Sequence, residues 1–324
     1  MSVTFSGGGV TISGGGWTLS APPSTPTAGW YGGGFSGPPY ARTSTVARIT
    51  FATDTATPTT RGPLSATRYN LAGTGTLTYG WYGGGNTPTL LSSIDRITFA
   101  SDTDTAAVRG SLSAGRYNFT ATTDSTTYGW FIVGFNGGSA LSVIDRITFS
   151  TDTATASVRG PVSASVYGSA STTDSSTYGW FNYGRTPSAR LSTVARITYA
   201  TDTNSPTVRG PLSATKYRVA ATGTTSYGWY AGGAPPSGGG SISTVDRIDY
   251  SNDTATASVR GSLTATQLNF AASTDGTTYG WFGGGGDGYS IVNRITYATD
   301  TATATSRAPF SPGGTGWAAT SGVQ

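Results

Sequence analysis

The sequence predicts an all-β fold, a six-bladed β-propeller whose blades are four-stranded antiparallel sheets. A Gly-Trp pair followed by an aromatic residue occurs six times, and an Arg-Ile pair follows each one. A second arginine stands thirteen residues after every Arg-Ile arginine. The repeat is 47 to 52 residues long, which is the length of one four-stranded blade. The tryptophans of the six pairs are Trp30, Trp81, Trp130, Trp180, Trp229 and Trp281.

The fifth unit illustrates how one blade is expected to form. Residues 216–222 alternate in polarity and predict the first strand, and residues 226–233 predict an aromatic second strand that ends in a glycine doublet. After a polar loop, residues 243–250 predict the third strand. A turn then leads into a fourth strand at residues 255–263. No helical periodicity interrupts this pattern.

The C-terminal segment is expected to close the ring. In most units an apolar residue of the first strand lies seven residues after a Leu-Ser-like position, and Phe310 plus seven is Trp317. The segment at residues 317–320 (WAAT) matches residues 219–222 (VAAT) almost letter for letter. Because the unit at Trp30 otherwise lacks a first strand, the C-terminal strand is expected to supply it and to remove the open edges. The alternative is that residues 10–19 supply this strand and add a partial seventh blade.

These boundaries divide the chain into an arm and a ring. Residues 1–29 form a Gly/Ser/Pro-rich arm, in which Trp17 is expected either to anchor the arm to a partner or to pack against the ring. The propeller spans residues 30–324. Its expected repeats are 30–65 together with 312–322, then 66–113, 114–163, 164–213, 214–264 and 265–311.

The predicted strand order and the glycine doublets resemble the kelch repeat of β-propellers. In a kelch blade an inner strand precedes an apolar strand that ends in Gly-Gly, and an outer strand completes the sheet. The third and fourth units depart from this pattern, with only Gly134 and Gly184 at the doublet, and valines such as Val108 replace the outer-strand tryptophan. The doublets of the other units are Gly32-Gly33, Gly83-Gly84, Gly232-Gly233 and Gly283-Gly284.

A narrower resemblance concerns the wording of the repeat. The phrase DRIDYSNDTATASVRG at residues 246–261, followed by a YGWFGGG strand, looks like repeats of virion structural proteins of marine cyanobacterial phages. The resemblance implies a non-enzymatic structural or adhesive component of a phage particle, located in the virion. Its partners would be other virion proteins of the capsid or tail, reached through the arm, and a host-surface glycan reached through loops.

Composition narrows the functional classes. The chain has no cysteine, histidine or glutamate and only one lysine, Lys216. Thiol chemistry and the usual zinc and copper sites are therefore not expected, and no cofactor is expected. The net charge of +4 comes from arginines spread over all repeats, so no nucleic-acid surface is expected. No apolar run reaches membrane-spanning length, so no membrane insertion is expected.

An aspartate stands six residues after each Arg-Ile arginine. Two interpretations are open, namely six anion or calcium sites, or a structural Arg-Asp-Arg set that ties the last turn of a blade to its neighbour. The structural interpretation is favoured because the set is copied into every unit and arginine pairs well with carboxylates. The doublet Asp102/Asp104 alone suggests calcium, but no glutamate completes such a loop. The full set is Arg48, Asp54, Arg61, Arg96, Asp102, Arg109, Arg146, Asp152, Arg159, Arg196, Asp202, Arg209, Arg247, Asp253, Arg260, Arg294, Asp300 and Arg307.

Catalysis has little support in the sequence. The repeated tryptophans are expected to pack between blades rather than to stack on sugars, because they recur at one strand position in every unit. No histidine base or cysteine nucleophile exists, and no unit is interrupted by a polar active-site segment. No catalytic residue is predicted, and a glycan-active enzyme remains only an alternative.

Variable loops provide the candidate binding surface. The spacing from Arg-Ile to the Leu-Ser-like position is sixteen in every unit, whereas the spacing from Gly-Trp to Arg-Ile ranges from 13 to 18. The length variation therefore follows the glycine doublet, in loops that a kelch-like blade places on one face. Tyrosine, arginine and glycine on variable loops are typical of recognition surfaces, although such loops also vary simply because they tolerate change. A carbohydrate-binding host-recognition module is the main alternative function. The candidate binding residues are Phe35, Tyr40, Arg42, Phe135, Tyr183, Arg185, Arg190, Asp287 and Tyr289.

Overall fold

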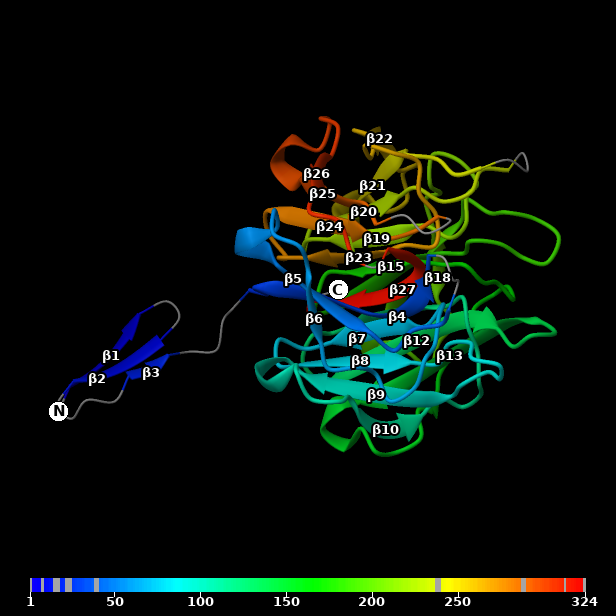
Figure 1. Ribbon diagram of the computed structural model, residues 1–324. Helices are drawn as coiled ribbons and strands as arrows, with labels where there is room; N and C mark the ends of the chain where they lie inside the picture. The colour runs from blue at the N-terminus through cyan, green and yellow to red at the C-terminus, as the bar shows by residue number, and fades with distance from the viewer. Residues whose placement is uncertain are drawn as a thin grey trace.

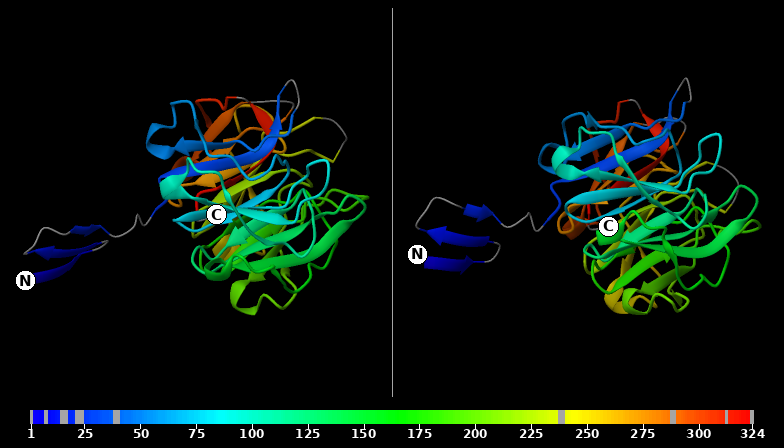
Figure 2. Two further views of the ribbon diagram at one scale, coloured as in Figure 1. Left: turned by 60° about the horizontal axis from the view of Figure 1, so that its bottom comes forward. Right: turned by 90° about the horizontal axis from the view of Figure 1, so that it is seen from below.

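Six four-stranded antiparallel sheets surround a common axis as the blades of a propeller (Figure 1, Figure 2). The computed structural model describes residues 2–6, 9–13, 18–20, 25–37, 41–236, 240–286, 290–311 and 313–322. In each blade the innermost strand lies beside the axis, and the three following strands lead outward, as the sequence predicts. The fold class predicted from the repeat is therefore confirmed.

The strand bounds follow the repeat. The first blade contains β27 (Gly314–Thr320), β4 (Ala28–Ser36), β5 (Val46–Thr50) and β6 (Thr59–Arg61). The second and third contain β7 (Ala72–Gly75), β8 (Tyr79–Gly83), β9 (Ser93–Thr98), β10 (Ala107–Ser111), β11 (Thr120–Thr123), β12 (Tyr128–Phe135), β13 (Ala140–Thr148) and β14 (Ser157–Val158). The fourth and fifth contain β15 (Ser171–Thr173), β16 (Tyr178–Asn182), β17 (Val194–Thr198), β18 (Thr207–Arg209), β19 (Ala220–Gly223), β20 (Tyr227–Ala231), β21 (Val245–Asp249) and β22 (Ser258–Arg260). The sixth contains β23 (Ala271–Thr274), β24 (Tyr279–Gly283), β25 (Val292–Thr296) and β26 (Thr305–Arg307).

A short 3₁₀ helix follows the third strand of every blade, which the sequence pattern did not indicate. Each has only three residues, too few to produce a helical periodicity in the sequence. Each opens with an aromatic residue that packs toward a neighbouring blade. The six are η1 (Phe51–Thr53), η2 (Phe99–Ser101), η3 (Phe149–Thr151), η4 (Tyr199–Thr201), η5 (Tyr250–Asn252) and η6 (Tyr297–Thr299).

The C-terminal strand closes the ring. β27 pairs antiparallel with β4, with Trp317 opposite Gly33 and Thr320 opposite Trp30. The alternative, a strand from residues 10–19 and a partial seventh blade, is therefore wrong. The described strands of that region, β2 (Gly9–Ser13) and β3 (Thr18–Ser20), pair with each other and, through β2, with β1 (Ser2–Ser6) in a sheet of their own (Figure 1).

The innermost strand of the fifth blade begins later than the sequence pattern predicts. The predicted strand covers residues 216–222, whereas β19 begins at Ala220. Arg218 has a φ of 61°, which lies in the left-handed region outside the extended conformation, and its N–H bonds the carbonyl of Gly168 in the preceding blade. Lys216 is turned inward and is 1% exposed. The segment before the strand therefore joins blades rather than extending one.

The hydrophobic core lies between blades. Six clusters of buried side chains each combine the tryptophan of one blade with residues of the next. In one example Trp30 packs with Tyr82 and Ile97 of the second blade. Burying these aromatic surfaces is the main favourable contribution to folding, and it requires both neighbours of every blade.

Candidate functional site

The Arg-Asp-Arg residues predicted to be structural meet between neighbouring blades. Asp102 in the second blade accepts a hydrogen bond from Trp30 Nε1 at 2.8 Å and pairs with Arg48 at 3.0 Å and Arg61 at 3.4 Å, all from the first blade. The same four-residue set occurs at all six interfaces, and Asp54 completes the ring with Trp281, Arg294 and Arg307. The other sets centre on Asp152, Asp202, Asp253 and Asp300. Each aspartate thus pairs with two guanidinium groups and accepts a hydrogen bond from one indole N–H.

A second set of buried charges was missed by the sequence analysis. Arg68 pairs with Asp95 at 3.2 Å, and both side chains are 0% exposed. Ser65 donates two further hydrogen bonds to Asp95, from its N–H and its hydroxyl. Burial lowers the pKa of Arg68, and the charge of Asp95 opposes this shift. Equivalent pairs are Arg116–Asp145 and Lys216–Asp246.

The internal repeats contained the signal for these pairs. One position lies four residues after the Leu-Ser-like position, and the other lies one residue before Arg-Ile. The residue types at these two positions change together from unit to unit. The sixth blade has Gln267 with Asn293, which are joined by a hydrogen bond of 2.7 Å. The fourth blade has two apolar residues instead, Val166 and Ala195.

Tyr183 is not a loop-face binding residue, contrary to the sequence prediction. Its side chain is 3% exposed and belongs to the core cluster that contains Val166 and Ala195. Its hydroxyl shares a hydrogen bond of 2.8 Å with Ser163. The tyrosine packs where the second, third, fifth and sixth blades place a charged or amide pair. The correction therefore has a physical cause, the absence of that polar pair from the fourth blade.

One mouth of the ring is framed by a closed circle of backbone hydrogen bonds. In each blade the residue directly before the first channel-lining residue has a positive φ, from 54° to 71°. The N–H of each of these residues bonds the carbonyl of its equivalent in the preceding blade at 2.7–3.0 Å. The circle consists of Asn70, Asn118, Gly168, Arg218, Asn269 and Gly316.

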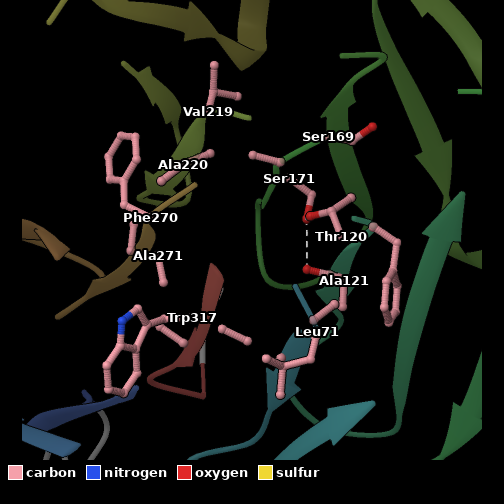
Figure 3. A pocket seen from close by; sticks show the side chains of 18 residues that line it. Leu71, Thr120, Ala121, Ser169, Ser171, Val219, Ala220, Phe270, Ala271 and Trp317 are labelled. Carbon is pink, nitrogen blue, oxygen red and sulfur yellow. Dashed lines mark hydrogen bonds between the residues drawn. The ribbon is translucent and has the colours of Figure 1, made fainter. Parts of the chain in front are cut away.

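The axial channel behind this circle is narrow. Its cavity is about 90 Å³, and the wall is made mostly of small residues of the innermost strands, together with Leu71, Phe270 and Trp317 (Figure 3). Thr120 and Ser171 share a hydrogen bond of 2.7 Å across neighbouring blades. The channel has room for only a few waters. It is not a ligand site of ordinary size.

A wider cavity lies at the same mouth, and we call it the loop-face cup. It has a volume of about 430 Å³, within the range of ligand sites. Aromatic rings from four blades line it in a chain of contacts, with centroid distances of 5.5 Å for Phe35–Tyr69, 5.7 Å for Tyr117–Phe135 and 5.0 Å for Phe135–Tyr167. The remaining lining residues are Asn70, Asn118, Arg218, Asn269 and Thr315.

The structure places the predicted binding residues as follows. Phe35 and Phe135 line the cup, as half-buried side chains. Arg42 lies over Tyr69 at 5.5 Å, and Arg185 lies over Tyr167 at 5.4 Å, so both are adjacent to the cup. Arg190 lies 4.9 Å from the ring of Tyr217. Trp17, Tyr40, Asp287 and Tyr289 lie outside the described residues.

The sequence analysis missed the tyrosines that form most of the cup. Tyr69, Tyr117 and Tyr167 occupy equivalent positions, just before the residues of the hydrogen-bonded circle. Four of the six units have a tyrosine at this position, and the sequence pattern assigns it to a strand. Burial raises the pKa of Tyr117, and the neighbouring phenols of Tyr69 and Tyr167 add to the shift while Arg218 opposes it. The hydroxyl is therefore neutral near pH 7 and able to donate and accept.

Four arginines at this face differ from all the others. Within the described part of the chain no ion pair involves Arg42, Arg185, Arg190 or Arg218, whereas every other arginine has a carboxylate partner. Tyr217 lies within 5.2 Å of the guanidinium carbons of Arg185, Arg190 and Arg218. Uncompensated guanidinium groups around a concave site produce a positive potential that favours anionic ligands.

Two further properties concern metals and membranes. Among the described residues no group of three or more acidic side chains converges as a metal site would require. Across those same ranges the structure contains no helix long and apolar enough to span a membrane.

Comparison with known proteins identifies the fold only. No family model matches the chain, and a search of curated proteins found no match. A solved structure described as "Structure of YjhT" superposes with a TM-score of 0.64 and 11% sequence identity, covering 82% of this chain and 91% of that one. At this identity the similarity supports a shared propeller fold and carries no information about ligands.

Proposed function

We propose that this chain is a non-enzymatic recognition protein of a phage particle and that the loop-face cup binds host-surface carbohydrate. The observation that carries the proposal is the cup, whose wall combines aromatic rings, phenolic hydroxyls and amide groups. A sugar has apolar ring faces and a rim of hydroxyls, so it needs this combination of flat apolar contacts and hydrogen-bonding groups. The lining contains no carboxylate among the described residues, which supports binding rather than hydrolysis.

The attachment of the arm supports an outward orientation of the cup. β4 begins at Ala28 and reaches the cup at Phe35, so its first residue lies at the opposite face of the ring. An arm that leaves from that face can dock to a capsid or tail while the cup points toward the host. The placement in a virion rests on the resemblance of the repeats to virion proteins of cyanobacterial phages.

A second candidate function, lateral contact with other virion subunits, is favoured by a different observation. Four outer strands each expose one valine at an equivalent position, with 53–58% of the side chain accessible. Exposed apolar residues on outer strands are features of assembly surfaces. These residues are Val108, Val158, Val208 and Val259.

A glycan array tests the proposal with two matched variants. Tyr117→Ala removes one ring from the cup, and Val158→Ser changes an outer strand on the same blade. We expect about 5- to 150-fold weaker glycan binding for Tyr117→Ala, by analogy with the roughly 1–3 kcal/mol that an aromatic stacking contact contributes to nucleic-acid binding, and unchanged binding for Val158→Ser. Thermal unfolding checks that both variants fold.

Three outcomes would contradict the proposal in different ways. Release of a cleaved sugar from a bound glycan would contradict the non-enzymatic assignment. Absence of glycan binding by the wild-type protein would remove the carbohydrate function. Loss of binding to virion proteins in Val158→Ser, together with no glycan binding, would favour the lateral-contact function instead.

A further inference from the structure

We infer that Arg218 makes the loop-face cup selective for a carboxylated sugar, a uronic acid residue of an acidic polysaccharide. The inference rests on the proposed carbohydrate function and names the ligand class of the same site. It depends on three properties of Arg218, namely its place in the circle of six, its unpaired charge and its surroundings.

Arg218 is the exceptional member of the hydrogen-bonded circle. The five equivalents are asparagine or glycine, the residues that tolerate a positive φ best. An arginine with a φ of 61° carries a backbone cost of about 1 kcal/mol or more. The hydrogen bond from its N–H to Gly168 holds the residue in this conformation at 2.8 Å. A strained residue where asparagine would fit better points to a role for the side chain.

The guanidinium of Arg218 is present in the cup without a counter-ion. No ion pair to it is found in the described ranges, and its Nε is buried without a hydrogen-bond partner. It lies 5.1 Å from the ring centroid of Tyr217, which orients the side chain before any ligand binds. A planar guanidinium that retains free donors is suited to the two oxygens of a carboxylate.

The rest of the lining favours a sugar acid over other anions. Only one of the four unpaired arginines lines the cup, so the site matches a single carboxylate rather than a run of phosphates. The rings of Tyr117, Phe135 and Tyr167 line the same cavity and offer surfaces for the apolar face of a sugar. The amides of Asn118 and Asn269 are placed to bond its hydroxyls. Arg185 and Arg190 strengthen the positive potential from outside the cavity.

The test compares two oligosaccharides of equal length, an oligogalacturonate and its neutral galactose counterpart, by titration calorimetry with the full chain. We expect the uronate to bind at least tenfold more tightly than the neutral oligomer, and we expect this preference to weaken as salt is raised. Arg218→Asn should abolish the preference, because the affinity for the uronate falls to that for the neutral oligomer. This variant should fold, because asparagine occupies three of the six equivalent positions. Arg42→Gln, at the other side of the cup, is the matched control and should retain most of the preference.

The outcomes separate the inference from the proposed function. Equal binding of the two oligomers, or an uronate preference that survives in Arg218→Asn, would overturn the inference while the carbohydrate function stands. If inorganic phosphate displaces the uronate and binds more tightly than the uronate does, the inference is likewise overturned. If neither oligomer binds and the glycan array is also blank, the proposed function fails together with the inference.

Discussion

At the scale of single residues, the aspartate between blades illustrates how one side chain serves several partners. Asp102 accepts the indole N–H of Trp30 and neutralises Arg48 and Arg61, all in the neighbouring blade. The sequence predicted an Arg-Asp-Arg set that ties a blade to its neighbour, but not that the aspartate comes from the next unit or that it accepts an indole N–H. Only the packing of one blade against the next brings these residues together.

Replacing this aspartate is expected to destabilise the fold strongly. Asp102→Ala leaves a buried indole donor unsatisfied and two guanidinium groups without a counter-charge. We expect the free energy of unfolding to fall by about 3–5 kcal/mol. Urea denaturation measures this change. Asp104→Ala, in the same turn but exposed, is the control and should change stability by less than about 0.5 kcal/mol. Similar losses in both variants would contradict the structural role of Asp102.

At the scale of the blade, the sequence predicts the strands well and the connections between them less well. Alternation and glycine doublets predicted the number and order of strands, because side chains on a half-buried sheet must alternate. The connections before the innermost strands were misread, since a tyrosine followed by asparagine has no periodic signature. The cup residues Tyr69, Tyr117 and Tyr167 lie in those connections. The candidate site was therefore only partly predictable, through Phe35 and Phe135.

The buried polar pair found in four of the blades is expected to behave as a replaceable module. Asp95→Asn alone leaves the fully buried Arg68 without a counter-charge, and we expect a loss of about 3–5 kcal/mol. The double variant Arg68→Gln/Asp95→Asn reproduces the Gln267–Asn293 pair of the sixth blade. It should recover most of that loss.

A double-mutant cycle by urea denaturation measures the coupling of Arg68 and Asp95. We expect a coupling energy of at least about 1 kcal/mol, because the two residues are in direct contact. The single variant Arg68→Gln completes the cycle. Additive losses would mean that the pair is not an exchangeable unit and that each residue is held by other neighbours.

At the scale of the whole molecule, the closure of the ring follows from the repeat, whereas the distribution of charge over its faces does not. The match between residues 317–320 and 219–222 was sufficient to predict that β27 completes the first blade. The charge distribution was not predictable, because it depends on which arginines remain after the ion pairs have formed. The unpaired arginines lie around the cup, whereas Asp124, Asp174 and Asp275 cap turns at the opposite face. The ring thus has one face with uncompensated positive charge, the face that carries the cup.

The buried tyrosines set the alkaline limit of the fold. Burial raises the pKa of Tyr31, Tyr82, Tyr199, Tyr230 and Tyr297 far above the usual value of about 10. A raised folded pKa contributes stability that is complete below the unfolded pKa and is lost as the pH rises above it. Above about pH 10 each phenol therefore reduces the free energy of unfolding by up to about 1.4 kcal/mol per pH unit.

Lys216 opposes this trend but does not reverse it. Burial lowers its pKa, so its contribution to stability grows as the pH rises toward the unfolded value of about 10.5. One lysine acts against these five tyrosines and Tyr250, whose pKa burial also raises, and the net result is a steep loss of stability in alkali. Urea midpoints from about pH 8 to about pH 11 measure the slope, and Tyr82→Phe should make it shallower by about one proton per molecule. Midpoints that stay constant or rise over this range would show that these phenols ionise as easily in the folded ring as in the unfolded chain.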